Sequence, residues 1–449
     1  MDLASTDTIA AIATPPGNGG VGIIRISGSV ASNIAHTLLQ IETLRPRFAH
    51  YGKFLDVTGY PIDSGICLYF SAPASYTGED VVELQAHGGS VVMHMLLSRV
   101  IQLGARLAKP GEFTQRAFLN NKMDLAQAEA VADLITSSTA QAVRSAQNSM
   151  QGIFSEQINA LVEQITYLRA YVEAAIDFTD EEIDFLSTAN IEGQLNELLS
   201  KISKIQASAQ QGRLLHDGMT VVLAGKPNAG KSSLLNTLAG YEVAIVNEIA
   251  GTTRDVLKER IQIDGMPLHI IDTAGLRESD NLIEQEGIRR ARKEIEKADQ
   301  ILLLIDWQDP EQQIILDTLP QTGKLTKIFN KIDLQQRPAE LINYAHETHI
   351  YLSVKTGQGM DLLIQHLKQA AGFQENSEHL FIARQRHIEA LRFSYQALEC
   401  ALSQMQLSSP AELIAEELRQ AQMHLSEITG KFTSDDLLGK IFSSFCIGK

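Results

Sequence analysis

Hydrophobic positions follow a short-period pattern in the first part of the chain. Val21–Ile26, Gly65–Tyr69 and Asp80–Leu84 are short runs rich in β-branched residues, and glycines separate them. One further stretch, Ser90–Leu103, has helical spacing. Short apolar runs bounded by glycine and proline are typical of strands joined by turns. We therefore predict a small α+β domain over residues 1–121.

From Lys122 the apolar residues recur at steps of three and four, which places them along one stripe of each helix. The stripes are Ile158, Leu161, Ile165, Leu168, Val172 and Ala175; Leu195, Leu198, Ile202 and Ile205; and Ile388, Leu391, Tyr395, Leu398 and Leu402. Ser409-Pro410 opens another helix, with serine as cap and proline in the first turn. We predict one all-α domain in two parts, residues 122–217 and 376–449, whose stripes cover each other.

Residues 218–375 instead alternate strand-like and helix-like segments, a pattern typical of a parallel α/β domain. The predicted strands are Thr220–Ala224, Arg260–Ile263, Leu268–Ile271, Ile301–Ile305, Thr326–Phe329 and His349–Leu352. Neither helical flank contains strands, so the economical interpretation is an α/β domain inserted into the helical domain. The predicted fold class is multidomain: an α+β N-terminal domain, an all-α domain and an inserted α/β domain.

Length and charge support this division. At roughly 150 residues per domain, 449 residues predict about three domains. The chain carries 38 Lys and Arg against 54 Asp and Glu, a net charge of −16, so any contact with nucleic acid requires a local basic patch. Residues 1–121 hold 8 Lys and Arg against 9 Asp and Glu, which places the excess acid after residue 121.

Cysteine use and the lengths of the apolar runs indicate the compartment. Cys67, Cys400 and Cys446 are too few for a disulfide framework and fit a reducing compartment. No apolar run approaches the ~18 residues of a membrane helix. The first residues carry acids and no basic region, which excludes a secretory signal or transit peptide. We expect a soluble cytoplasmic protein, with Cys67 and Cys400 in protein cores.

Gly225–Ser232 reads GKPNAGKS and fits the GxxxxGKS/T pattern of a phosphate-binding loop. Its glycines let backbone N–H groups curl around phosphates, Lys231 reaches the β- and γ-phosphates, and Ser232 binds Mg²⁺. The strand Thr220–Ala224 precedes the loop, and the helix Ser233–Leu238 follows with its positive end toward the phosphates. This context predicts a P-loop rather than a plain glycine turn.

Further motifs follow in the order that a GTPase requires. Asp272 to Gly275 reads DTAG after a predicted strand, where the carboxylate can hold the Mg²⁺ shell and the Gly275 N–H can reach the γ-phosphate. In the Asn330–Asp333 sequence NKID, the carboxylate of Asp333 can accept hydrogen bonds from guanine N1–H and the 2-amino group. Adenine offers no such pair of donors, so we predict GTP rather than ATP.

Two shorter segments complete the predicted GTP site. Ser353-Val354-Lys355 follows a strand and is placed to close over guanine O6. The sequence GTTRD begins at Gly251, between the P-loop and DTAG, where a switch segment belongs. We predict that Thr253 supplies the second hydroxyl to Mg²⁺.

The residue after DTAG is Leu276, where many signalling GTPases have a glutamine that orients the attacking water. Leucine can neither donate nor accept a hydrogen bond, so another group must position the water. The motifs resemble those of translation-factor-related GTPases, and this resemblance indicates Glu284, in the second switch (Leu276–Glu286). From the residues alone, the favoured interpretation of Glu284 is an exposed helix glutamate.

Both ends of the chain carry a more specific resemblance. The sequence TPPGNGGVGIIRISG lies near the N-terminus, GTTRD lies in the G domain, and Phe445–Lys449 reads FCIGK, a C-x-G-K pattern. Together with a G domain inserted in a helical domain, these segments resemble the MnmE (TrmE) family of tRNA modification GTPases. The resemblance covers essentially the whole chain.

The resemblance implies a homodimer formed through an N-terminal domain similar to folate-binding domains of aminomethyltransferase type. That domain would bind 5,10-methylene- or 5-formyl-tetrahydrofolate. With the partner MnmG (GidA), which uses FAD and NADH, family members form a heterotetramer. The complex adds an aminomethyl or carboxymethylaminomethyl group to C5 of the wobble uridine of certain tRNAs. GTP hydrolysis drives the G domains together and apart, and the modification requires this cycle.

The resemblance also assigns residues. Arg25, Glu83, Lys122 and Lys449 match the family's folate contacts. Asn228 matches a potassium ligand, and Asn247, Ile249 and Thr252 would surround the same ion. The K⁺ ion would place a positive charge beside the phosphates, where other GTPases use an arginine finger. Glu284 and Lys231 match the catalytic residues of hydrolysis. The residues assigned to GTP are Asn228, Ala229, Gly230, Lys231, Ser232, Ser233, Asn247, Glu248, Ile249, Ala250, Gly251, Thr252, Thr253, Asp272, Thr273, Ala274, Gly275, Asn330, Lys331, Asp333, Ser353, Val354 and Lys355.

Alternatives remain open at two points. Cys446 is either a nucleophile toward C6 of uracil or a residue that lines the site beside Lys449. A ribosome-assembly or regulatory GTPase would use the same G motifs without modification chemistry, but would leave residues 1–121 and the C-x-G-K segment without a role. A signalling GTPase with an external arginine finger would show no potassium requirement.

Overall fold

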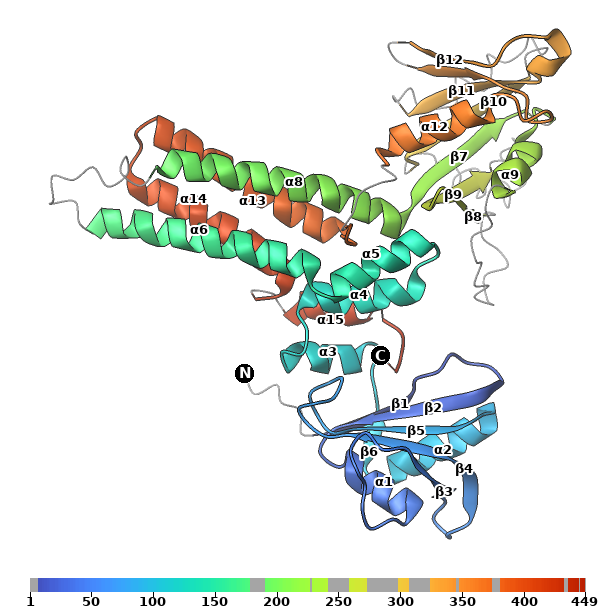
Figure 1. The fold of residues 1–449 in the computed structure, drawn as a ribbon, viewed down its shortest axis with the longest axis vertical. Coiled ribbons are helices and arrows are strands. Elements are labelled where there is room, and N and C mark those ends of the chain that lie inside the picture. Colours follow the sequence, from blue (N-terminus) through green and yellow to red (C-terminus); the bar gives the residue numbers. More distant parts are fainter. Residues whose placement is uncertain are drawn as a thin grey trace, which may run out of the picture. The chain divides into compact units, whose positions relative to one another are not determined.

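The computed structural model describes residues 7–177, 190–226, 228–240, 258–272, 298–306, 324–344, 347–373, 380–431, 435–443 and 445–448. The chain divides into two compact units (Figure 1). The first unit comprises Met1–Ala132, Ile158–Glu163 and Gln422–Lys449, and the second comprises Asp133–Gln157 and Gln164–Ala421. Segments far apart in the sequence therefore fold together in both units.

The first unit is built on a six-stranded sheet in the order β3-β4-β5-β2-β1-β6. The strands are β1 (Thr8–Ile12), β2 (Gly19–Ser27), β3 (His50–Leu55), β4 (Pro61–Phe70), β5 (Val81–Gly88) and β6 (Ala105–Leu107). All neighbours are antiparallel except β1 and β6. The three predicted strands correspond to β2, β4 and β5.

Alternation along the strands separates the two faces of this sheet. Ile24 and Ile26 are buried together with residues of helices α1 (Ala31–Leu39) and α2 (Ser90–Gln102), which cover one face. Because successive side chains point to opposite faces, Arg25 of β2 and its register partner Glu83 of β5 lie on the other face. The sheet thus holds two predicted folate residues side by side.

The helical stretch predicted at Ser90–Leu103 is confirmed as α2, but two further helices before residue 121 were not predicted. Helix α1 was missed although Ile34, Ala35 and Leu38 recur at helical steps and are buried. Helix α3 (Glu112–Leu119) was also missed. Cys67 is buried in β4, as predicted, but Cys400 is exposed, because the buried residues of its helix are the neighbours Leu398 and Ala401.

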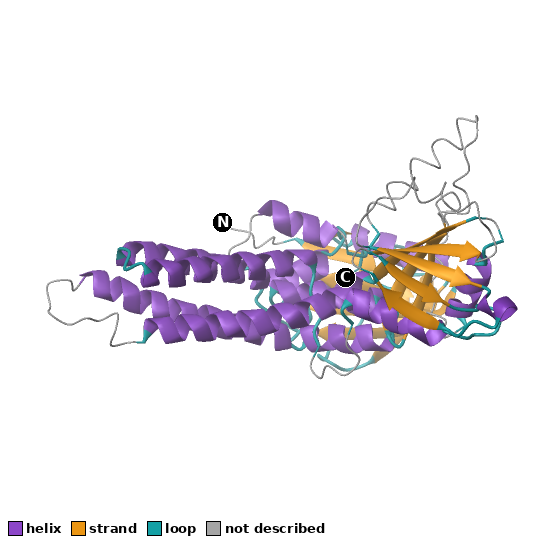
Figure 2. Cartoon of the chain, turned by 90° about the horizontal axis from the view of Figure 1, so that it is seen from above, coloured by secondary structure: helices purple, strands orange, loops and turns teal. Residues whose placement is uncertain are grey.

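Long helices come from both sides of the inserted domain. They are α4 (Leu125–Thr136), α5 (Ala140–Met150), α6 (Ile153–Asp177), α8 (Ile191–Asp217), α13 (Gln385–Gln406), α14 (Ala411–Thr429) and α15 (Asp435–Ser443). Helices α8 and α13 pack side by side within the second unit (Figure 1). Figure 2 shows long helices, in purple, that run alongside one another. Leu195, Leu198, Leu391 and Leu398 of the predicted stripes are buried. This packing confirms that the two helical parts cover each other.

The inserted domain contains a seven-stranded sheet in the order β12-β13-β11-β10-β7-β9-β8. Its strands are β7 (Met219–Gly225), β8 (Lys258–Ile263), β9 (Met266–Asp272), β10 (Gln300–Asp306), β11 (Leu325–Asn330), β12 (Glu340–Asn343) and β13 (Thr348–Tyr351). Helices α9 (Lys231–Ala239) and α12 (Met360–Ala371) belong to the same domain. The predicted fold class, an α/β domain inserted between helices, is confirmed.

The five strands from β13 to β9 are parallel, as predicted, but both edge strands are antiparallel to their neighbours. Strand β12 was not predicted. Strand β8 was predicted to be parallel to its neighbour, but it runs antiparallel to β9. The reason is that only two residues, Asp264-Gly265, join the two strands, and so short a connection reverses the chain direction. Both residues have positive φ, 49° and 81°, and Asp-Gly is a strong hairpin signal.

No helix in the described ranges is long and apolar enough to cross a membrane.

The domain boundaries at residues 121, 217 and 375 stay predictions.

Candidate functional site

The phosphate loop lies between β7 and α9, as predicted. Gly225 and Gly230 have φ of 146° and 104°, and Asn228 has φ of 63°. A Cβ atom at Gly225 would lie 2.5 Å from the carbonyl oxygen of Leu304, and one at Gly230 would lie 2.4 Å from Nδ2 of Asn330. Glycine is required at both positions, because the conformation and the close approach exclude a side chain.

Lys231 begins α9 and curls back over this loop. Its side chain is buried, and Nζ donates to the carbonyl oxygens of Gly225 at 2.6 Å and Lys226 at 3.0 Å. The ammonium group is therefore held where phosphate oxygens would meet the loop, and an anion makes stronger hydrogen bonds with it than a neutral carbonyl does. Ser232 and Ser233 are exposed in the first turn of α9, which fits the predicted Mg²⁺ contact of Ser232.

Asn330, at the end of β11, joins three predicted segments. Its Nδ2 donates to the carbonyl of Ala229 in the P-loop at 2.9 Å. Its Oδ1 accepts from the N–H groups of Lys331 at 2.8 Å and Val354 at 3.1 Å. The side chain is 4% exposed. One buried amide thus fixes the P-loop, the NKID segment and the Ser353–Lys355 segment relative to one another.

The predicted guanine carboxylate is held by a neighbour. Ser353 Oγ donates to Asp333 Oδ1 at 2.6 Å, which fixes the orientation of the carboxylate. Lys331 pairs with Asp306 at 2.6 Å beside it. Val354 is buried in the hydrophobic core of this domain, and its N–H donates to Oδ1 of Asn330. Its side chain therefore anchors the Ser353–Lys355 segment to the core.

Several predicted residues lie outside the described part of the chain. They are Asn247, Glu248, Ile249, Ala250, Gly251, Thr252, Thr253, Thr273, Ala274, Gly275, Glu284 and Lys449. Only the backbone of Asp272, the last residue of β9, is described. The predicted roles of these residues stay predictions.

The predicted folate residues Arg25 and Glu83 form an ion pair on the sheet of the first unit. Arg25 Nε donates to Glu83 Oε1 at 3.0 Å, and the two side chains are 19% and 18% exposed. The guanidinium group also lies 5.5 Å from the ring centroid of Tyr76 and 5.8 Å from that of Phe113. The pair is thus enclosed by aromatic rings but still open to solvent.

The C-x-G-K segment docks beside this pair. Arg25 Nη1 donates to the carbonyl of Gly448 at 3.2 Å. Gly448 has φ of 97°, and a Cβ atom there would lie 2.7 Å from the carbonyl oxygen of Ile12. The N–H of Gly111 donates to the carbonyl of Cys446 at 3.4 Å, and the Cys446 side chain is exposed. The structure brings Arg25, Glu83 and Gly448 together. Gly448 directly precedes Lys449, which is the predicted folate contact.

A buried ionic network positions the loop that joins β4 to β5. Arg116 pairs with Glu79 at 3.0 Å, Glu112 at 3.2 Å and Asp7 at 2.8 Å. Burial raises the pKa of Glu112, but hydrogen bonds, first that of Arg106, outweigh it and hold the pKa below its usual range. Sequence reasoning missed this network, because no local motif joins its members.

A second ionic cluster lies where the inserted domain joins the helices of the second unit. Asp133 of α4 is 3% exposed; it accepts from Arg384 Nη2 at 2.5 Å and from His216 Nε2 at 3.1 Å. His216 lies near the end of α8, and Arg384 immediately precedes α13. One carboxylate therefore binds both chain connections of the inserted domain. Sequence reasoning missed it too.

This cluster predicts a pH dependence of stability. The hydrogen bond to Asp133, followed by that to Asp217, raises the pKa of His216 from 6.5 to about 9. The stabilisation is therefore fully present below pH ~6.5 and is lost as the pH rises through about 9. We expect wild type to exceed the His216→Gln variant in unfolding free energy by about 1–3 kcal/mol at pH 6, with most of that difference gone at pH 10.

Chemical denaturation at both pH values measures this difference. His94→Gln, on α2 of the first unit, is the matched control, because it removes an imidazole that lies outside the Asp133 cluster. A His216→Gln difference that is equal at both pH values would contradict the assignment.

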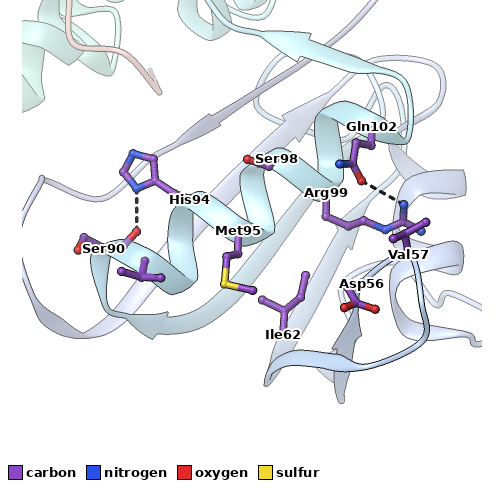
Figure 3. Close-up of a pocket in the computed structure, with 10 residues that line it drawn as sticks. Asp56, Val57, Ile62, Ser90, His94, Met95, Ser98, Arg99 and Gln102 are labelled. Carbon is purple, nitrogen blue, oxygen red and sulfur yellow. Dashed lines mark hydrogen bonds between the residues drawn. The ribbon is translucent and has the colours of Figure 1, made fainter.

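A groove on the first unit is separate from both candidate sites (Figure 3). It measures about 530 Å³ and lies between α2 and the β3–β4 connection. Its lining residues are Asp56, Val57, Ile62, Ser90, Val91, His94, Met95, Ser98, Arg99 and Gln102. Because α2 covers the sheet face opposite Arg25, substitutions in this groove are useful controls.

Comparisons with known proteins identify the family. The chain matches the family described as the MnmE helical domain over residues 125–446, and that described as the GTP-binding protein TrmE N-terminus over residues 8–122. It is 57% identical over 452 residues to the tRNA modification GTPase MnmE of Hydrogenovibrio crunogenus, covering 100% of both chains. It is 56% identical over 455 residues to that of Pseudomonas paraeruginosa, covering 99% of this chain and 100% of the relative.

Among solved structures, the G domain of the T. maritima FeoB iron transporter is 26% identical, with a TM-score of 0.26, covering 34% of this chain and 98% of that chain. Full-length identity above half to curated relatives, and family matches to both parts of the sequence, agree with the resemblance found from the motifs. The chain therefore belongs to the MnmE family of tRNA modification GTPases.

Proposed function

We propose that this protein binds and hydrolyses GTP in the site formed by the P-loop, Asn330 and Asp333, and that hydrolysis serves the modification of tRNA. The observation that carries the GTP assignment is the Asp333 carboxylate, which Ser353 holds at 2.6 Å. Asn330 ties this base-recognition region to the P-loop. The tRNA assignment is supported by the name and full-length similarity of the curated relatives.

The modification proposed is the addition of an aminomethyl or carboxymethylaminomethyl group to C5 of the wobble uridine. The protein would act as a homodimer in the cytoplasm, in a heterotetramer with MnmG (GidA), which carries FAD and NADH. The net charge of −16 supports a shared task, because so acidic a chain offers little electrostatic attraction to RNA by itself.

A one-carbon tetrahydrofolate is the proposed cofactor of the first unit, and it would supply the methylene carbon of the group that is added to C5 of the uridine. The residues present fit such a group. Glu83 can accept from the donor edge of a pterin ring, and Arg25, held against Tyr76, can face an anionic or carbonyl oxygen. Lys122 is exposed, and Lys449 follows the docked Gly448. Cys446 would line this site through the tail that Gly111 holds.

Mg²⁺ and K⁺ are the proposed ions of the G domain, where they would neutralise phosphate charge. Ser232 and Thr253 would hold Mg²⁺. Asn228, with Asn247, Ile249 and Thr252, would hold K⁺. The left-handed backbone of Asn228, with φ of 63°, and its exposure in the P-loop fit a ligand that faces the phosphates. Glu284 would activate the attacking water, and Lys231 would bind the β- and γ-phosphates.

GTP turnover by the purified protein, in potassium and in sodium at equal ionic strength, tests the GTPase proposal. We expect at least about tenfold faster turnover in potassium, because the ion replaces an arginine finger. Asn228→Ala is expected to lose most of this stimulation. Equal and slow rates in both salts would favour a GTPase that needs an external activator, such as a ribosome-assembly or signalling protein.

Folate binding tests the modification chemistry. Arg25→Ala is expected to weaken binding of 5-formyl-tetrahydrofolate at least about tenfold, because a charge-assisted hydrogen bond contributes about 1.5–3 kcal/mol. Isothermal titration calorimetry measures the affinity. Arg99→Ala, which removes the same charge on the opposite face of the sheet, is the control. Equal affinities of wild type and Arg25→Ala would reject the assignment of Arg25.

A further inference from the structure

Two cationic side chains hold consecutive carbonyl groups of the loop between β4 and β5. Lys122 Nζ donates to the carbonyl of Pro73 at 3.0 Å, and Arg47 Nη2 donates to the carbonyl of Ala74 at 2.8 Å. Consecutive Cα atoms lie ~3.8 Å apart, so the two cationic groups lie within roughly 11 Å of each other. Lys122 is a proposed folate contact, whereas no motif singled out Arg47.

The charges of this pair are not matched by acids. Within the described ranges neither Arg47 nor Lys122 forms an ion pair with a carboxylate, and both residues are exposed. Their hydrogen-bond acceptors are neutral carbonyl groups. Two positive charges side by side repel each other, and an anion placed between them would relieve this repulsion. The pair is therefore suited to an anionic ligand group.

The backbone of Arg47 is held in an uncommon conformation. Its φ is 58°, in the left-handed region that non-glycine residues rarely adopt. The N–H of Arg47 donates to the carbonyl of Tyr69 at 2.7 Å, and its guanidinium group lies 5.8 Å from the ring centroid of Phe70. These contacts aim the side chain at the loop. Strained residues that surrounding contacts hold in place are frequent in ligand sites.

The same loop connects this pair to the proposed folate site. Tyr76, two residues after Ala74, lies under the Arg25 guanidinium group. A folate has its pterin ring at one end and the carboxylates of its glutamate tail at the other. With the pterin at Arg25 and Glu83, a tail running along the loop from Tyr76 would pass the carbonyl groups of Ala74 and Pro73, where Arg47 and Lys122 are held. The first glutamate is assigned to Lys122 because Lys122 is the predicted folate contact.

We propose that Arg47 binds the carboxylates of the second and later glutamates of a polyglutamylated tetrahydrofolate, next to a first glutamate that Lys122 holds. This proposal rests on the proposed folate binding by Arg25 and Glu83. Lys122 holds the first glutamate, and Arg47 adds affinity that depends on tail length. The protein would thereby select the polyglutamylated cofactor over the monoglutamate.

The test compares 5-formyl-tetrahydrofolate with one and with three γ-linked glutamates, titrated calorimetrically into the full-length protein. Wild type is expected to bind the triglutamate at least about fivefold more tightly than the monoglutamate, because an added arginine–carboxylate pair contributes that much affinity. Arg47→Ala is expected to lose this preference and to keep its monoglutamate affinity within about twofold. Arg47→Lys is expected to retain part of the preference, which also falls as salt is added.

The outcomes separate the two proposals. If wild type binds neither folate, the proposed folate function fails. If wild type binds both forms equally, or Arg47→Ala keeps the full preference, the tail subsite is wrong and folate binding stands. Arg99→Ala, with the same charge change on the opposite sheet face, is expected to keep the preference. Thermal denaturation shows whether Arg47→Ala is folded, and Arg47→Lys provides a second readout.

Discussion

Replacing Asp333 with asparagine is expected to weaken GTP binding at least about 100-fold and to transfer the preference to xanthosine triphosphate. The carboxylate can accept from guanine N1–H and from the 2-amino group, two charge-assisted bonds of about 1.5–3 kcal/mol each. An asparagine amide would face the 2-amino group with a donor. Xanthine has a carbonyl at this position, which accepts from the amide. Ser353, which holds Oδ1 of Asp333 at 2.6 Å, can also donate to an amide oxygen.

Competition with a fluorescent nucleotide measures both affinities. The gain for xanthosine triphosphate distinguishes a changed specificity from a misfolded domain, since a misfolded domain binds neither nucleotide. Asp361→Asn, in the first turn of α12, makes the same chemical change away from the base site. Wild-type selectivity in Asp333→Asn would show that another group recognises guanine.

Glu284→Ala is expected to slow GTP hydrolysis about 1,000-fold while GTP affinity stays within about twofold. General-base catalysis typically contributes 10²–10⁴-fold, and Leu276 cannot replace it because its side chain makes no hydrogen bonds. A group that acts on the attacking water contributes to the transition state more than to the binding of GTP. A lower rate with unchanged affinity is therefore the expected pattern.

Single-turnover phosphate release in potassium measures the rate, and fluorescent-nucleotide binding measures the affinity. Glu286→Ala, two residues further along the same switch segment, is the control and is expected to hydrolyse GTP at close to the wild-type rate. Unchanged turnover in Glu284→Ala would refute its assignment. A parallel loss of affinity and rate would assign Glu284 to nucleotide binding instead.

The G domain was the most predictable part of the fold. Its motifs follow apolar strands, so local patterns placed the P-loop, Asp333 and Ser353 correctly at the ends of β7, β11 and β13. The central role of Asn330 was not predictable, because its bonds to Ala229 and Val354 exist only after the strands pair. The hairpin at Asp264-Gly265 is indicated by its turn residues, whereas the alternation of strands and helices alone predicts a parallel neighbour.

The folate residues were assigned by resemblance, and the fold supplies the physical reason for part of that assignment. Register places Arg25 opposite Glu83, and the docked tail brings Gly448 to them. Arg47 and the Asp133 cluster had no local signal. Asp133 and Arg384 are 251 residues apart, and their contact depends on how the helices pack. Sequence spacing reports neighbours along one element, whereas these sites are made by separate elements.

The docked tail also has a consequence for synthesis. Arg25 and Gly448 are 423 residues apart, and the ribosome makes them in that order. At roughly 5–20 residues per second, about 20 to 85 s pass between the two. The N-terminal sheet can fold during this interval, but the proposed folate site lacks the tail until Gly448 has been made. We expect a nascent chain that stops before Gly448 to contain the sheet without a finished site, so that folate binding, if it takes place here as proposed, requires synthesis of the tail.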